Sequence, residues 1–312
     1  MVSGSFYHSE EPFMPEIYSK EYSWYNNNYS TNGELLLSPY SNETVVVPVQ
    51  AYATPTNAYA LHAKFNVDNL EVGYFRNYES HSSSISSKPE YTIYGKDELF
   101  IETVESMYTK YHFETSDKKW NFQTILSYSK DEIDPETHYI NTFTSYEKGY
   151  KYGYNKSLRF EDQVKVQLFK SINLTGGVFF EDLTSLAKTS DLPFAFDKDV
   201  AANIQNLYYL GTNILDSAGN DLSIYQDLYY LQYRNYGTFL QLQSNLTNTL
   251  RLTLGARLDY NTHYGYTLNP RAGLVYSPVE TFRIKLLYGK AYLQPSPYRA
   301  YQHYGSFIPV VD

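Results

Sequence analysis

The sequence predicts an all-β fold in which antiparallel strands form a barrel that crosses a membrane. Three observations predict it. Apolar and polar residues alternate with a period of two in many stretches, short turns and long polar connections alternate along the chain, and 36 of the 312 residues are Tyr. No apolar run approaches the roughly 18–20 residues that a membrane-spanning helix needs. No long stretch has helical spacing either, and residues 198–208 are the best candidate for a short helix in a loop.

Composition excludes several other classes of protein. Aromatic residues make up 18% of the chain, too many for a disordered protein, which lacks the apolar surface to order itself. The net charge of −9 disfavours nucleic acid as a partner. The chain has no Cys and therefore neither disulfides nor thiolate metal ligands. A mean hydropathy of −0.49 makes this Tyr-rich chain polar on average.

The strands are predicted from alternation, because successive side chains of a strand point to opposite faces. Residues 2–7 resemble the end of a strand rather than a signal peptide, which has a basic segment and then an apolar run. The pattern is clearest at 250–260, where four Leu on one face oppose Arg251, Arg257 and Asp259 on the other. It recurs in six more stretches: 59–67, 70–78, 120–128, 158–168, 174–181 and 282–291.

The connections between these stretches are of two kinds. Short turns with Asn, Asp, Ser or Pro are predicted at 68–69, 116–119, 171–173, 247–248 and 278–281. Long polar segments lie between the hairpins at about 9–57, 80–102, 131–156 and 186–230, and a shorter one at about 261–268. Short turns at one end and long loops at the other are typical of membrane barrels, which have short periplasmic turns and long extracellular loops.

The alternation alone fits a soluble barrel or sandwich as well, since only the direction of the apolar face differs. The placement of aromatic residues favours the membrane. Tyr276 and Phe282 flank one short turn, and Tyr260 and Tyr288 lie near the opposite strand ends. Aromatic residues at both ends of an apolar band are typical of the two membrane interfaces.

Residues 250–305 resemble the mid-barrel signature of TonB-dependent outer-membrane receptors. The matching pieces are LGARLD at 254–259, NPRAGLVY at 269–276, YGKAY at 288–292 and Pro295-Ser296, and YGTFLQ at 236–241 fits the preceding strand. The resemblance implies an N-terminal plug domain and a barrel of about 22 strands. We count ten strands in five hairpins plus the stub at 2–7, and we find no plug domain.

We therefore expect residues 1–312 to be an internal part of one such barrel domain, about 10–11 strands of a 22-stranded barrel. Two cut edges would expose unpaired backbone groups, which lipid does not tolerate. We predict that this chain alone forms no closed, stable barrel. A folded, heat-modifiable species of it in detergent would contradict that prediction.

Two groups of residues are candidates for contact with a ligand or with the plug. The predicted polar wall of the lumen consists of Arg159, Glu161, Glu181, Arg257, Asp259 and Arg271, with small residues nearby at 255, 273, 289 and 291 that allow a close approach. In the resembling family, extracellular loops capture the ligand. The loop candidates here are Tyr22, Trp24, Tyr25, Tyr29, Tyr208, Tyr209, Tyr298, Arg299, Tyr301, His303 and Tyr304. For both groups, ordinary structural packing is the competing interpretation.

No catalytic or metal-binding motif stands out, so we expect neither an enzyme nor a cofactor. The seven His residues are scattered, and no pair has the spacing of metal ligands. Glu10, Glu11, Glu16 and Glu21 are read as solvated loop charges in preference to a divalent-cation site.

The resemblance implies a receptor in the outer membrane of a Gram-negative bacterium that takes up a scarce, bulky ligand. A ferric siderophore is the leading expectation, ahead of cobalamin or another chelate or oligosaccharide. The implied partners are outer-membrane lipid and the TonB energy-coupling complex, which would act on the plug. Two alternatives remain open: a passive porin-like channel, and a soluble secreted β-protein that binds carbohydrate.

Overall fold

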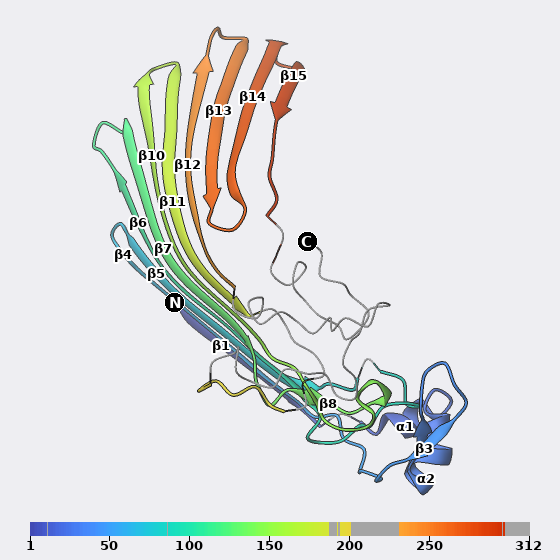
Figure 1. The fold of residues 1–312 in the computed structure, drawn as a ribbon. Coiled ribbons are helices and arrows are strands. Elements are labelled where there is room, and N and C mark those ends of the chain that lie inside the picture. The colour runs from blue at the N-terminus through green and yellow to red at the C-terminus, as the bar shows by residue number, and fades with distance from the viewer. Residues whose placement is uncertain are drawn as a thin grey trace.

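One antiparallel sheet of eleven strands dominates the computed structural model of the chain (Figure 1). The structure describes residues 1–10, 12–85, 87–186, 192, 194–200, 231–294 and 296. The strands lie side by side in chain order: β1 (Val2–Ser9), β4 (Thr56–Val67), β5 (Leu70–Ser82), β6 (Leu99–Glu114), β7 (Trp120–Ile133), β10 (Gly153–Phe169), β11 (Ile172–Leu186), β12 (Leu231–Asn245), β13 (Leu250–Asn261), β14 (Gly265–Val279) and β15 (Phe282–Gly289). The predicted five hairpins and the N-terminal stub are confirmed. The sheet curves without closing, because within the described residues β1 and β15 each pair with one neighbour only.

The five short turns lie together at one end of the sheet and the long connections at the other (Figure 1). Two of the turns contain a residue with positive φ, Asp68 at 48° and Lys118 at 57°. Both are polar residue types suited to turns, and the sharp reversals keep this end of the sheet short.

One predicted connection is shorter than expected. The sequence predicts a polar loop over residues 261–268, but β13 continues to Asn261 and β14 begins at Gly265. The Asn261 side chain accepts hydrogen bonds from the backbone N–H groups of His263 and Tyr264, at 2.7 and 2.9 Å, and so closes a three-residue turn. The polar side chains on either side of this turn lie on strands that continue to pair.

The long connections carry the remaining elements: α1 (Met14–Ile17), η1 (Tyr25–Tyr29), α2 (Ser30–Asn32), β2 (Glu34–Leu36), β3 (Thr44–Val46), β8 (His138–Tyr139), η2 (Thr142–Thr144) and β9 (Gly149–Tyr150). The short helices thus lie in the first long connection and the third. Most of the expected helix at 198–208 lies outside the described residues. None of the helices in the described part of the chain is long and apolar enough to span a membrane.

The two faces of the sheet differ in chemistry. Leu240, Leu254 and Leu258 lie on one face and are 56%, 43% and 43% exposed, although they belong to strands with a neighbour on each side. The hydrophobic clusters among the described residues lie elsewhere, in the long connections and at the ends of the strands that join them. Exposure of an apolar sheet face to water is costly, so this face favours a hydrophobic surrounding.

Candidate functional site: a polar wall and a loop cap

Neighbouring strands bring the predicted wall residues onto one face of the sheet. Cross-strand partners point to the same side. Arg159 is paired with Glu181, Glu161 with Phe179, and Phe179 with Gly237. These rows of paired residues continue through Asp259 and Arg257 on β13 and through Arg271 on β14. All six predicted residues share this polar face: Arg159, Glu161, Glu181, Arg257, Asp259 and Arg271.

A pocket of about 680 Å³ lies on this face. Five of the six predicted residues line it. The sixth, Glu161, does not line the pocket but is paired with Arg159, which does. The sequence reasoning missed Phe179, Phe239, the three Asn at 235, 261 and 269, and residues after β15, namely Lys290, Tyr292 and Gln294. The missed residues on strands could have been found from the strand register. Each is the cross-strand partner of a predicted residue or lies two positions from one on the same strand.

Two arginines of the wall are held by acids on their own strands. Arg159 is paired with Glu161, and Arg257 Nε lies 2.8 Å from Asp259 Oδ1. Such half-exposed pairs add little stability, but they restrict where the guanidinium groups lie. Arg271 and Lys290 have no acidic partner among the described residues. The pocket lining holds four cationic and two anionic side chains, so it is positive within an acidic chain.

Aromatic rings cover glycines on this face. The Phe179 ring occupies the space that a Cβ on Gly237 would need, and the Phe239 ring does the same at Gly177. Because Phe179 pairs with Gly237 and Phe239 with Gly177, the two strands exchange rings reciprocally. Gly255 makes room for the side chain of its partner Arg271, whose Nε would lie 3.0 Å from a Cβ there. These glycines accommodate neighbours within the wall.

A chain of hydrogen bonds fixes the row of pocket residues nearest the long connections. Ser157 Oγ donates to Glu181 Oε1 at 2.9 Å, and Asn235 Nδ2 donates to Glu181 Oε2 at 2.7 Å. Asn261 Nδ2 then donates to Asn235 Oδ1 at 2.6 Å. Asn269 Oδ1, by contrast, is buried without a hydrogen-bond donor among the described residues. The wall is therefore ordered before any ligand arrives, with one acceptor left over.

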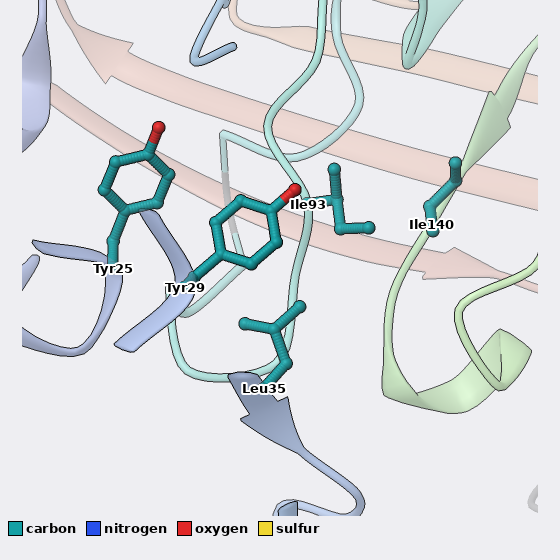
Figure 2. Close-up of a cluster of buried hydrophobic side chains, with 5 residues drawn as sticks. All are labelled: Tyr25, Tyr29, Leu35, Ile93 and Ile140. Atoms are coloured by element: carbon teal, nitrogen blue, oxygen red, sulfur yellow. The ribbon is translucent and has the colours of Figure 1, made fainter. Parts of the chain in front are cut away.

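The long connections 10–55, 83–98 and 134–152 pack into one body, which we call the loop cap. Its core contains Tyr25, Tyr29, Leu35, Ile93 and Ile140, which come from all three connections (Figure 2). Backbone bonds join the connections as well: Leu36 N–H donates to Glu90 O at 2.8 Å, and Ile93 N–H donates to Ile140 O at 3.1 Å.

Burial raises the pKa of Tyr29 to about 12. Its hydroxyl donates to Pro48 O at 3.2 Å and accepts from Gln50 N–H at 2.9 Å. Burial also raises the pKa of Tyr94 and of Tyr52, whose rings stack at 5.4 Å. These phenols stay protonated and act as packed, hydrogen-bonded groups.

The predicted loop residues of the first connection are part of this core. Tyr29 is 1% exposed and Tyr25 4%, while Tyr22 and Trp24 pack against them. Their contact with a ligand stays a prediction. The other loop candidates lie outside the described residues: Tyr208, Tyr209, Tyr298, Arg299, Tyr301, His303 and Tyr304.

The acidic residues of the first connection give no sign of a metal centre. Glu10, Glu16 and Glu21 are exposed, and Glu11 lies outside the described residues. Within the described ranges, no group of three or more His, Asp or Glu could hold a metal ion.

Comparisons with known proteins agree with this architecture. Residues 17–310 match the family model described as TonB dependent receptor-like, beta-barrel. No curated protein sequence matches the chain.

Solved structures are similar in fold. A mutant ferric enterobactin receptor from Pseudomonas aeruginosa is 14% identical, with a TM-score of 0.55 over 88% of this chain and 38% of that one. Another mutant of that receptor, in complex with enterobactin, is 13% identical, with a TM-score of 0.53 over 96% and 40%. The siderophore receptor PirA from the same organism is 10% identical, with a TM-score of 0.49 over 80% and 35%. The chain thus spans 35–40% of the length of these structures.

Proposed function

The chain belongs to the TonB-dependent receptor family, as part of its β-barrel, and we propose from this that it serves active uptake of a ferric siderophore across a Gram-negative outer membrane. The family consists of receptors and transporters, and its members lie in that membrane. In this proposal iron is the cargo, bound within a chelate, and the protein needs no cofactor of its own.

One observation carries the proposal: a sheet with an exposed apolar face bears a positively charged pocket on its other face. The apolar face fits lipid, and the polar face then lines a hydrated lumen. Arg159, Arg257, Arg271 and Lys290 would attract a ligand with several negative charges. Many ferric chelates carry such charges, and one of the similar structures is a receptor in complex with enterobactin.

Two parts of the chain would act one after the other in transport. The loop cap would form part of the outer entrance, since it lies at the end of the sheet opposite the short turns (Figure 1). The polar wall would then hold the chelate by charge and by its exposed amide groups. Release inward would need the plug and the TonB complex, which supply the energy.

The test uses the complete gene in its host under iron limitation. Deletion of the gene should abolish saturable uptake of one ⁵⁵Fe-labelled siderophore from a panel of catecholates, hydroxamates and carboxylates, and the gene on a plasmid should restore it. A protonophore should stop that uptake, because energy reaches the outer membrane from the inner one. Growth and uptake that are unchanged by deletion for every siderophore would refute the proposal.

A passive porin-like channel is the alternative that the same experiment separates. Its uptake would rise linearly with ligand concentration and persist in the presence of the protonophore. A soluble carbohydrate-binding protein would need no detergent after extraction, whereas a barrel with this apolar face should precipitate without it.

A further inference from the structure

The charged residues of the apolar sheet face gather toward one edge. On β7, β10, β11 and β12 they lie near the strand ends that lead into the long connections: Lys130, Glu132, Lys156, Asp182 and Arg234. One more, Asp162, lies halfway along β10 and accepts a hydrogen bond from Thr124 at 2.6 Å. The parts of these strands near the short turns bear uncharged residues on this face, so the two edges of the membrane-facing surface differ in charge.

Three lysines form a cluster at the charged edge. Lys130 and Lys156 are direct cross-strand partners and therefore point to the same side. Lys198, in the connection after β11, reaches Glu132 with its Nζ 2.6 Å from Oε1, while Lys130 Nζ lies 2.7 Å from Oε2. Lys156 forms no ion pair among the described residues. We call Lys130, Lys156 and Lys198 the lysine cluster, which places three positive charges beside a single carboxylate.

The third lysine is held in place by the packing of its segment. The Phe196 ring stacks on Tyr152, with ring centres 4.1 Å apart. Leu192 is buried and exchanges backbone hydrogen bonds with Tyr150 at 2.9 and 3.0 Å. Both tyrosines come directly before β10 in the chain, so these contacts bring Lys198 to the loop-side end of that strand. The meeting of Lys198 with Glu132 therefore follows from a packed backbone.

The positive charges of the cluster are directed outward. The side chain of Glu132 is only 11% exposed, whereas those of Lys130 and Lys198 are 30% and 48% exposed. Like charges on directly opposed strand residues repel each other, and a bound anion relieves that repulsion. Three lysines less one glutamate leave a surplus of two positive charges. A phosphate monoester suits this surplus, because it carries three acceptor oxygens and about 1.5–2 negative charges.

The apolar surface continues directly from the cluster. Leu158 and Phe160 follow Lys156 on the same face of β10, and Leu126 lies beside Phe160 on β7. All three apolar side chains are exposed. Because β7 and β10 have a neighbour on each side, closure of a barrel by further strands leaves this face outermost. A ligand that covers both the cluster and the apolar surface has an anionic head and apolar chains, as a membrane lipid does.

We infer that the lysine cluster binds the phosphate headgroup of a membrane lipid, whose chains lie over Leu126, Leu158 and Phe160. The lipid belongs to the leaflet at the level of the long connections. Lysines near a membrane attract anionic headgroups, and their long stems cover apolar surface while the ammonium groups reach the interface. This inference goes beyond the proposed function and is independent of the ligand transported and of the pocket in the lumen.

The first experiment identifies the occupant. The complete receptor in an uncharged detergent is titrated with didecanoyl phosphatidic acid, and bound lipid is counted by native mass spectrometry. Didecanoyl glycerol has the same chains without the phosphate, and inorganic phosphate has the charge without the chains. We expect saturable binding of phosphatidic acid, with the other two weaker by about tenfold or more, since each lacks one half of the interaction.

The second experiment assigns the site. Lys156→Gln should weaken binding about fivefold, the effect of one lysine beside an anionic lipid surface. Lys156→Arg should keep the affinity, because it keeps the charge. Lys170→Gln removes the same charge just beyond the opposite end of β10 and should change nothing. Lys198→Gln should match Lys156→Gln, which tests whether the connection after β11 supplies part of the site.

Equal affinities for phosphatidic acid and didecanoyl glycerol would overturn the inference, as would binding of inorganic phosphate as tight as that of the lipid. Equal losses in Lys156→Gln and Lys170→Gln would place the lipid elsewhere and overturn it too. Siderophore uptake that fails in every test while the lipid titrations behave as expected would refute the proposed function alone.

Discussion

Tyr29 shows how a single residue organises the loop cap. Its ring is almost fully buried, and its hydroxyl bridges Gln50 N–H and Pro48 O in the same connection. The hydroxyl thereby ties the ring to the backbone on either side of residue 49. Sequence could suggest a functional loop tyrosine, but not this inward position, because nothing local distinguishes a buried ring from an exposed one.

Tyr29→Phe should destabilise the loop cap by about 0.5–1.5 kcal/mol, the net worth of a typical hydrogen bond, because it removes the hydroxyl bonds to Pro48 O and Gln50 N–H. Hydrogen exchange of the complete receptor should show faster exchange in residues 25–50, with the sheet unchanged. Tyr40→Phe is the control, since Tyr40 lies in the same connection and is 91% exposed. Equal exchange in the two variants would contradict the role of the Tyr29 hydroxyl.

Alkaline pH should open the loop cap before the barrel. Burial raises the pKa of Tyr29 and of Tyr146 to about 12, above the ordinary value of 10.0. The native state therefore keeps its phenol protons where the unfolded state loses them. Their stabilising contribution is complete below pH 10 and is lost as the pH rises through 12.

The measurement is a titration of tyrosinate absorbance together with hydrogen exchange in the cap. A set of tyrosines should ionise near pH 12 as the cap loses protection. Ionisation of every tyrosine near pH 10, with the cap still protected, would show that these phenols are not buried.

At the scale of elements, glycines on the strands of this sheet have two different structural roles. Gly237 lies beneath the Phe179 ring, whereas a Cβ on Gly289 would meet nothing within 4 Å among the described residues. Both glycines are visible in the sequence, but only the strand register shows which one lies opposite an aromatic residue. Gly237 pairs with an aromatic residue, and Gly289 lies at the end of an edge strand.

Gly237→Ala should therefore cost about 1–3 kcal/mol, since the added methyl group forces the ring from its place. Gly289→Ala should have little effect or a slightly stabilising one, because no atom of the described residues lies within 4 Å of a Cβ there. Urea unfolding of the complete receptor in lipid vesicles measures both variants. Similar midpoints for the two would argue against the covering of Gly237 by Phe179.

The hairpins and the polar wall were predictable, and the reasons are physical. A period of two determines which residues share a face, and turn-forming residues such as Asp68 mark where a strand reverses. The early start of β14 was not predictable, because Asn261 closes the preceding turn through side-chain bonds that no pattern reveals. The contacts of the Phe179 ring likewise involve arginines from β10 and β13, which alternation cannot place.

At the scale of the whole molecule, the exposed apolar face of the sheet is the property that decides between membrane and water. Leu240 and Gln241 are adjacent in β12 and lie on opposite faces, because Leu240 pairs with Ala256 and Gln241 with Gly255. Leu240 is 56% exposed in the absence of lipid. In water, a charge at such an exposed position would be harmless; in lipid, it would be costly.

Leu240→Arg should therefore destabilise the complete receptor in vesicles by about 2–4 kcal/mol, the cost of Arg at the middle of the bilayer on the outer face of a barrel. Gln241→Arg should cost much less, since its side chain enters a hydrated lumen that already holds Arg257 and Arg271. The heat-modifiable fraction on unheated gels and the urea midpoint measure the difference between two adjacent residues that receive the same charge. A soluble β-protein would tolerate the substitution at Leu240 as well as the one at Gln241, so equal stability of the two variants would place the apolar face in water.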